Sequence, residues 1–327
     1  MTAAIRPQEW LKFINQEYLS TFILDGGSTI KFAVPLEDSL RRDLFDGLAD
    51  ISLPSGYLVV TINASETKVH MMDEIFFRTA QQVPWRALSR KIIATLAAES
   101  GYSWIDGDDG PLFQRLAGHN RVDPQLLLLD LKKAIGDKVF KKRNLSRDFR
   151  VAMTHLCMAE LSGGQDGSAT TSKLIDWLTG RNKAVSAVKP YQIFRKINRQ
   201  TARYFFESMI HWIRFAGYPG TVILLDAQRL MLPKNPHDLS LYYSKAAVMD
   251  TYEVLRQFID SADQLEGCLI AVVPDITFLE DQSRGISAYE ALKFRVFDEI
   301  RDRSLVNPMA SLARISAPIE GDVRNGS

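Results

Sequence analysis

A carboxylate at the end of a buried strand is the residue of this sequence best suited to chemistry. The segment Gly220 to Leu230 contains an unbroken apolar run, Val222 to Leu225, and Asp226 comes directly after it. Such a run without alternation is typical of a strand that is buried on both faces, as in a parallel sheet between helices. In these sheets ligands bind at the carboxyl ends of the strands. Asp226 is therefore a candidate magnesium and nucleotide ligand, or a polar strand-end residue that caps the next segment of the chain.

The strand ending in Asp226 matches the Walker B strand of P-loop NTPases, whose Asp helps to hold Mg²⁺. Many of these enzymes place a water-polarising Glu next, and here Ala227 has that position. A Walker A loop, G-x-x-x-x-G-K-[ST], should come after the first strand, because its backbone N–H groups surround the phosphates. The chain has Pro35 to Arg42 there (PLEDSLRR), without a glycine. Glu37 and Asp38 are expected to cap a helix and to repel phosphate.

No cofactor is therefore expected for this protein. ATP and Mg²⁺ would bind only if the site is unconventional or is completed by a partner. Asp275 comes after the predicted strand Cys268 to Val273, where related ATPases keep a polar sensor residue, although Pro274 before it is unusual there. Arg284 and Arg295 are predicted to form surface salt bridges, because no phosphate cradle lies upstream.

A second nucleotide-related motif is Leu161 to Gln165, which spells the LSGGQ signature of ABC transporters. In that family the signature lies shortly before Walker B and acts against a partner's Walker A loop. Here it lies far before Asp226, and the Walker A loop is missing. We therefore interpret residues Ser162 to Ser172 as a flexible Gly-rich loop.

Two stretches combine basic and aromatic residues, a mixture that suits phosphate contact and base stacking. The first runs from Lys138 to Arg150 and includes Phe140 and Phe149, and the second is flanked by Phe194 and Phe205. The alternative is a solvated helix face with buried aromatic residues. The basic residues of this candidate nucleic-acid or partner surface are Lys138, Lys141, Lys142, Arg143, Arg147, Arg150, Arg195, Lys196, Arg199 and Arg203.

The composition indicates a globular protein whose overall charge creates no strong electrostatic field. The 327 residues are 46% hydrophobic and 24% charged, and the net charge is +1, so contact with nucleic acid would need a local patch. Cys157 and Cys268 lie in apolar surroundings and are predicted to be buried free thiols, which fits a reducing cytoplasm. No apolar run reaches the ~20 residues of a membrane span, so a cytoplasmic protein with no membrane partner is expected.

The elements that position these residues alternate between strand and helix at both ends of the chain. The predicted strands are Ser28 to Val34, Tyr57 to Asn63, Val222 to Asp226, Cys268 to Val273 and Ala313 to Ser316. Between them lies a largely helical middle. This order predicts an α/β fold with one parallel, P-loop NTPase-like (AAA-like) sheet and an inserted helical region. We assign residues 1–100 and 204–327 to the two halves of the sheet core and residues 101–203 to the insertion.

Several segments agree, in order, with motifs of a known family. They are a Gly-Gly-Ser turn at Gly26 to Ser28, a Leu-x-x-Trp-Leu-x-Gly segment at Leu174 to Gly180, an Arg-x-x-Gly-Tyr-x-Gly segment at Arg214 to Gly220, and a Phe…Arg-Gly-Ile-x-x-Tyr-x-Ala-Leu-x-x-Arg pattern at Phe278 to Arg295. With these motifs the chain resembles the P-loop ATP-binding family of bacterial BREX-type defence systems. The last pattern is one residue longer than in the family between Phe278 and Arg284. The departures that affect the chemistry are the lost Walker A loop and the ending Asp226-Ala227-Gln228-Arg229 in place of Asp-Glu-Ala-Glu.

The resemblance implies a P-loop-like fold and a setting in anti-phage defence or DNA modification, with BREX and DNA phosphorothioation as the two candidate systems. It does not carry over ATPase activity. We expect a pseudo-ATPase subunit that acts through other subunits of the system, with DNA as a further candidate partner. The alternative is an active ATPase with an unconventional or partner-completed nucleotide site.

Overall fold

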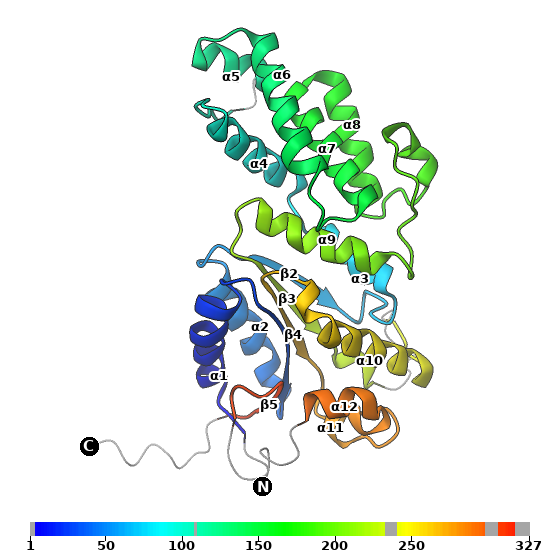
Figure 1. The fold of residues 1–327 in the computed structure, drawn as a ribbon. Coiled ribbons are helices and arrows are strands. Elements are labelled where there is room, and N and C mark those ends of the chain that lie inside the picture. The colour runs from blue at the N-terminus through cyan, green and yellow to red at the C-terminus, as the bar shows by residue number, and fades with distance from the viewer. Residues whose placement is uncertain (1–3, 108–109, 233–240, 298–306, 318–327) are drawn as a thin grey trace, which may run out of the picture. The chain divides into compact units, whose positions relative to one another are not determined.

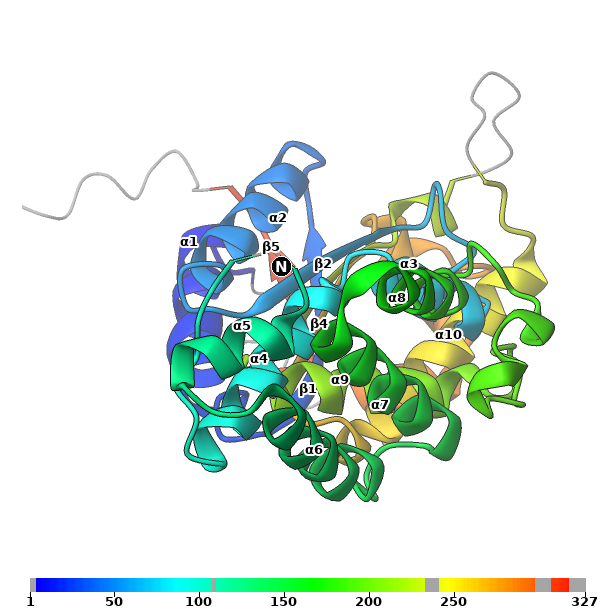
Figure 2. The same ribbon diagram turned by 90° about the horizontal axis from the view of Figure 1, so that it is seen from above.

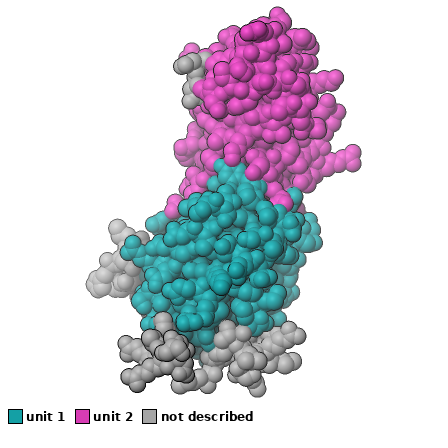
Figure 3. All heavy atoms as spheres, turned by 90° about the vertical axis from the view of Figure 1, so that its left-hand side faces the viewer, with its two compact units in different colours: residues 1–75, 218–327 teal, residues 76–217 magenta. Residues whose placement is uncertain are grey.

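The chain folds into two compact units. The computed structural model describes residues 4–107, 110–232, 241–297 and 307–317. The sheet unit comprises Met1–Ile75 and Tyr218–Ser327, and the helical unit comprises Phe76–Gly217 (Figure 3). The helical unit is longer than the insertion assigned at residues 101–203. It includes α4 (Trp85–Glu99) and α9 (Ala202–Phe215), because both pack against α7 (Arg147–Ser162).

The sheet unit is built on five parallel strands in the order β2-β3-β4-β1-β5. Their bounds are β1 (Ser28–Pro35), β2 (Leu58–Asn63), β3 (Thr221–Asp226), β4 (Cys268–Val273) and β5 (Leu312–Ile315). Each of the five predicted strands is present, within one residue at either end. The predicted fold class is confirmed, since this is an α/β, P-loop NTPase-like fold.

Helices cover both faces of the sheet (Figure 1). On one face lie α1 (Pro7–Phe13) and α2 (Ser39–Ser52), which bury an apolar layer against alternate residues of β1, β3 and β4. On the other face lies α10 (Lys245–Asp260). Burial on both faces is the physical reason that β3 and β4 are continuous apolar runs.

The family motif after β4 supports the sheet unit. Phe278, in α11 (Thr277–Glu280), stacks on Phe32 of β1 with ring centroids 5.8 Å apart. Nη2 of Arg284 donates hydrogen bonds to the carbonyl oxygens of Leu230 (2.9 Å) and Tyr243 (2.7 Å). Arg284 thus connects the loop after β3 to the segment before α10. The prediction that Arg284 forms a surface salt bridge is wrong. The motif ends in α12 (Glu290–Val296).

The helical unit contains α5 (Leu112–Asn120), α6 (Pro124–Ile135) and α8 (Gly164–Leu178) besides α4, α7 and α9, and α3 (Met72–Ala80) leads into it. Figure 2 shows α7 and α8 side by side. The prediction of a flexible loop at Ser162 to Ser172 is wrong, because α8 begins at Gly164. The chain reverses direction between α7 and α8 at Gly163, which has φ 63° and ψ −155°. A Cβ at Gly167 would lie 2.6 Å from the carbonyl oxygen of Ala159. The glycines allow close helix packing.

Both cysteines are buried free thiols, as predicted. Burial raises the pKa of Cys157 and of Cys268 to about 12, so neither sulfur carries charge at neutral pH. In the described part of the chain, no helix combines the length and the apolar character needed to cross a membrane.

Candidate functional site

The carboxyl edge of the sheet is where the fold would place nucleotide chemistry. Strand β4 lies between β1 and β3, and Asp226 at the end of β3 is paired in register with Val273 at the end of β4. Because all strands are parallel, the segment after β1 emerges at the same edge. That segment leads into α2, whose first turn contains Arg41.

Arg41 reaches across this edge. Its Nη1 lies 3.2 Å from Oδ1 of Asp226 and donates a hydrogen bond of 2.9 Å to the carbonyl oxygen of Val273, while its Nη2 donates one of 3.1 Å to that of Pro274. The side chain of Arg41 is 10% exposed and that of Asp226 is 18% exposed. The guanidinium is therefore a buried positive charge whose most buried counter-charge is Asp226.

The carboxylate of Asp38 completes this network and does not cap α2. Asp38 has the N-cap position, but its side chain makes no capping bond. Its Oδ1 instead accepts from Nε of Arg41 (3.1 Å) and from Nε2 of Gln228 (2.9 Å). The capping role predicted for this residue is wrong, because Arg41, one turn further on, offers a stronger charged donor. The N–H of Gln228 donates to Asp226 at 3.0 Å.

The residues after β1 do not fit the phosphates of a nucleotide at the position of a Walker A loop. Pro35 has no N–H group, and the N–H of Leu36 donates to the carbonyl oxygen of Ile315 at 2.8 Å. The N–H groups of Leu40 and Arg41 bond back to Glu37 and Asp38. Within the described residues, no group of three or more His, Cys, Asp or Glu side chains could hold a metal ion. The guanidinium of Arg41 bonds the carboxylate that Mg²⁺ would require.

Sequence reasoning missed Arg41 as a functional position. It was included in the segment Pro35 to Arg42 only as part of a lost Walker A loop. The available signal was a basic residue in the first turn of the helix after β1, in a chain that keeps an acidic residue at the end of β3. A basic residue after β1 and an acidic residue at the end of β3 lie on either side of the end of β4. An ion pair between them is predicted if both side chains are buried.

Asp275 lies near this edge but serves α11. Its Oδ1 accepts hydrogen bonds from the N–H (2.9 Å) and the Oγ1 (2.8 Å) of Thr277, which stabilises the start of that short helix. A sensor role for Asp275 stays a prediction. Arg295 forms the surface salt bridge predicted for it, because its Nη2 lies 2.9 Å from Oδ2 of Asp260.

The two basic stretches meet in the helical unit. The guanidinium of Arg147 lies 6.0 Å from the ring centroid of Phe194, and the N–H of Phe194 donates to Oδ1 of Asp148 at 2.9 Å. The side chains of Phe149 and Phe205 are fully buried, whereas Phe140 (48%) and Phe194 (58%) are exposed. Seven of the ten basic residues are exposed, namely Lys138, Lys141, Arg143, Arg147, Arg195, Lys196 and Arg199, while Lys142, Arg150 and Arg203 are half-buried.

We call this set of residues the basic-aromatic surface: the ten basic residues together with Phe140 and Phe194. Part of its charge is compensated within the unit. Nζ of Lys141 lies 2.6 Å from Oδ1 of Asp137, and Nζ of Lys138 lies 3.2 Å from Oε2 of Glu99. Of the four phenylalanines, Phe149 and Phe205 are therefore core, as the alternative interpretation holds, and Phe140 and Phe194 are available for contact.

Comparison with known proteins gives one family. The model of the BREX system ATP-binding protein BrxC/D family matches residues 126–318, which is more than half of the chain. The matched region includes β3 with Asp226, the LSGGQ turn, the basic-aromatic surface and the motif around Arg284. No curated protein and no solved structure matches the chain. The sheet order, the acidic end of β3 and this match lead to one conclusion: the chain belongs to the family of BREX system ATP-binding proteins.

Proposed function

We propose that this protein is a pseudo-ATPase, a non-catalytic P-loop-like subunit of a bacterial anti-phage defence or DNA-modification system. The observation that carries the proposal is the bond network of Arg41 at the carboxyl edge of the sheet. A guanidinium that bonds Asp226, the carbonyl oxygen of Val273 in β4 and that of Pro274 directly after β4 engages the carboxylate that magnesium would need. Ala227 removes the water-polarising carboxylate from the same strand end.

The proposal covers the setting as well. Family membership supports a BREX system, and DNA phosphorothioation is the second candidate system. A cytoplasmic location is part of the proposal and is supported by the two buried free thiols, which suit a reducing compartment. The protein would contribute a scaffold to an assembly of subunits and would leave hydrolysis to others.

The isolated protein is expected to show no ATP turnover with Mg²⁺, and the isosteric variant Asp226→Asn is expected to leave any nucleotide affinity unchanged. The physical reason is that Asp226 is already engaged by Arg41. Isothermal calorimetry with Mg-ATP, run beside a phosphate-release assay on both proteins, is the measurement. Micromolar, magnesium-dependent binding that is lost in Asp226→Asn would overturn the pseudo-ATPase proposal and favour the unconventional ATPase.

The basic-aromatic surface is proposed to dock another protein subunit rather than DNA. Its exposed aromatic rings suit a protein interface, in which aromatic residues and arginine are enriched. The carboxylates of Asp137 and Glu99 reduce its positive charge, and the net charge of +1 gives little long-range attraction for DNA.

Reversing two charges on this surface, Lys141→Glu with Arg143→Glu, is expected to abolish co-purification with the products of neighbouring genes. Both side chains are exposed, so the fold should remain intact. Lys142 is left unchanged because its Nζ lies 4.2 Å from the ring centroid of Phe215. The matched control reverses two exposed lysines elsewhere, Lys173 and Lys245.

A salt-titrated DNA mobility shift on the same proteins separates the two partner classes. Binding of DNA by the wild type that weakens with salt and is lost in the double variant would assign the surface to DNA, since each neutralised phosphate releases counterions. If the double variant behaves like the control in both assays, the surface is a solvated helix face and the docking proposal fails.

A further inference from the structure

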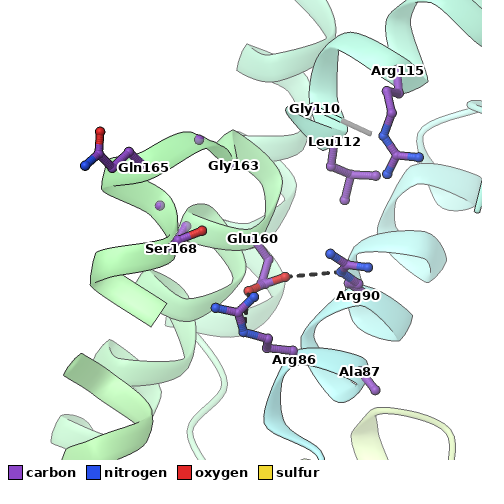
Figure 4. Close-up of a pocket in the computed structure, with 13 residues that line it drawn as sticks. Arg86, Ala87, Arg90, Gly110, Leu112, Arg115, Glu160, Gly163, Gln165 and Ser168 are labelled. Atoms are coloured by element: carbon purple, nitrogen blue, oxygen red, sulfur yellow. Dashed lines mark hydrogen bonds and ion pairs between the residues drawn. The ribbon is translucent and has the colours of Figure 1, made fainter. Parts of the chain in front are cut away.

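A large cavity lies inside the helical unit, among α4, the start of α5, the end of α7 and the first turn of α8 (Figure 4). Its volume is about 700 Å³, within the ~300–1,000 Å³ range of small-molecule sites. It uses none of the residues at the carboxyl edge of the sheet. Its lining includes Arg86, Arg90, Arg115, Glu160, Gly163 and Gly164.

The lining is positively charged. Arg86 and Arg90 lie one turn apart on α4, and the Nε atoms of both approach the carboxylate of Glu160, at 3.6 Å and 3.1 Å. Arg115 comes from α5, and its Nη1 donates to the carbonyl oxygen of Asp106 at 3.2 Å. Among the described lining residues, three carry a guanidinium group and one carries a carboxylate, which leaves two positive charges in excess. The Nε of Arg115 is buried and has no hydrogen-bond partner among the described residues.

Glu160 holds the two arginines of α4 in place. Its side chain is 5% exposed, and its Oε1 accepts a further hydrogen bond from Oγ1 of Thr171 at 3.1 Å. Arg86 and Arg90 both meet Glu160 through Nε, and for Arg86 this leaves the two terminal nitrogens outside that contact. A buried carboxylate that positions two guanidinium groups is a preorganised arrangement for an anion, because forked guanidinium groups bind phosphate oxygens in pairs.

The N-terminus of α8 adds backbone donors to the same cavity. The N-cap residue of this 15-residue helix is Gly163, which has no side chain to satisfy the first N–H groups. A Cβ at Gly164 would meet nothing within 4 Å, so the first turn faces open space. The partial positive charge of a helix N-terminus favours an anion there, in addition to the arginines.

A smaller cavity of about 250 Å³ continues the first one. The two cavities share Ala87, Arg90, Leu112 and Arg115. The smaller one adds the apolar residues Ala94, Trp104 and Ile105 together with Lys91, Asp106 and Gly107. The indole Nε1 of Trp104 donates to Oδ1 of Asp106 at 2.9 Å, which orients the ring. A cationic chamber therefore adjoins an apolar chamber with an aromatic wall. This pairing suits a ligand that has an anionic end and a flat ring.

We propose that the helical unit binds a phosphorylated, ring-bearing small molecule of the nucleotide class. Its phosphates lie among Arg86, Arg90, Arg115 and the first turn of α8, and its ring packs against Trp104. The site is independent of Asp226 and Arg41, so it stands whether or not the sheet unit is a pseudo-ATPase.

Calorimetry on the full chain with ADP, inorganic pyrophosphate and adenosine as probes tests the site. ADP is expected to bind more tightly than pyrophosphate, and adenosine more weakly than either. The double variant Arg86→Gln with Arg115→Gln is expected to weaken ADP at least tenfold. Trp104→Ala is expected to weaken ADP but not pyrophosphate. Arg90 is kept because it is the closer partner of the buried Glu160.

Two control variants test whether a loss of ADP binding is specific to this cavity. Arg42→Gln with Arg181→Gln removes the same charge from exposed positions and should leave ADP binding unchanged. Asp226→Asn should also leave it unchanged, and a loss there would locate the nucleotide at the sheet and count against the pseudo-ATPase proposal instead. If the glutamine variant does not fold, Arg86→Lys with Arg115→Lys replaces it and is expected to weaken ADP by a smaller factor.

The proposal is overturned if none of the probes binds at millimolar concentration, or if the arginine variants bind ADP like the wild type. It is also overturned if a single-stranded oligonucleotide binds and displaces ADP with higher affinity, because the cavity would then be part of a nucleic-acid groove.

Discussion

Replacing Asp226 with alanine is expected to lower the free energy of unfolding of the sheet unit by about 2–4 kcal/mol. The change removes the carboxylate 3.2 Å from Nη1 of Arg41 and leaves a guanidinium that is 10% exposed without its buried counter-charge. It also removes the acceptor for the N–H of Gln228. Asp38 stays near Arg41, but its side chain is 71% exposed, so it compensates only in part.

The conservative variant separates charge from shape. Asp226→Asn keeps an oxygen acceptor for Arg41 and Gln228, and a loss of only about 1–2 kcal/mol is expected. Phage protection or DNA modification in cells should then persist, because Asp226 acts as a structural residue. Loss of that function in an Asp226→Asn protein that is still folded at the growth temperature would contradict this role.

A double-mutant cycle with Arg41→Met isolates the pair. The coupling between Arg41→Met and Asp226→Ala is expected to be at least about 1 kcal/mol, since contacting residues of one network are not additive. Additive effects of the two changes would mean that the ion pair contributes nothing. Stability should be measured by hydrogen exchange resolved by peptide, because of the tryptophans only Trp10 lies in the sheet unit and the other four lie in the helical unit.

Replacing Gly220 with alanine is expected to destabilise the sheet unit by about 3 kcal/mol. Gly220 immediately precedes β3, and its missing Cβ would lie well inside van der Waals contact of the carbonyl oxygen of Gly267 and 3.2 Å from Cε1 of Tyr57. That carbonyl accepts the N–H of Thr221 at 2.8 Å, so it cannot move without disturbing the β3–β4 pairing. The crowding is with backbone, which relaxes less easily than a side chain.

Gly47→Ala is the matched control in the same unit. The three atoms nearest to a Cβ at Gly47 all belong to the side chain of Leu11, which can rotate away, and alanine is the better helix former by about 1 kcal/mol. A net change of no more than about 1 kcal/mol is expected. Urea unfolding monitored by hydrogen exchange compares the two variants, and equal effects of Gly47→Ala and Gly220→Ala would show that the approach of Gly220 to Gly267 is not constraining.

The fold could be predicted because its signals are local. Strands β3 and β4 are buried on both faces and are therefore apolar runs, and strand–helix alternation then implies a parallel sheet. Residues 162–172 were wrongly predicted to form a flexible loop, because glycine occurs both in flexible loops and at tight turns between packed helices. The same Gly-Gly pair that permits flexibility also permits a reversal at φ 63° and the close packing of α8 on α7.

The sequence by itself determined that this chain has a P-loop-like sheet, a missing Walker A loop and an acidic residue at the end of β3. Each of these features can be recognised from short runs of neighbouring residues and their order along the chain. Only the tertiary structure decided which residue the carboxylate of Asp226 contacts. Arg41 meets Asp226 from 185 positions away, and Arg86, Arg115 and Gly164 surround one cavity from three separate segments. Contacts of this kind depend on how distant elements pack and in which register strands pair, and no local pattern of residues encodes that choice.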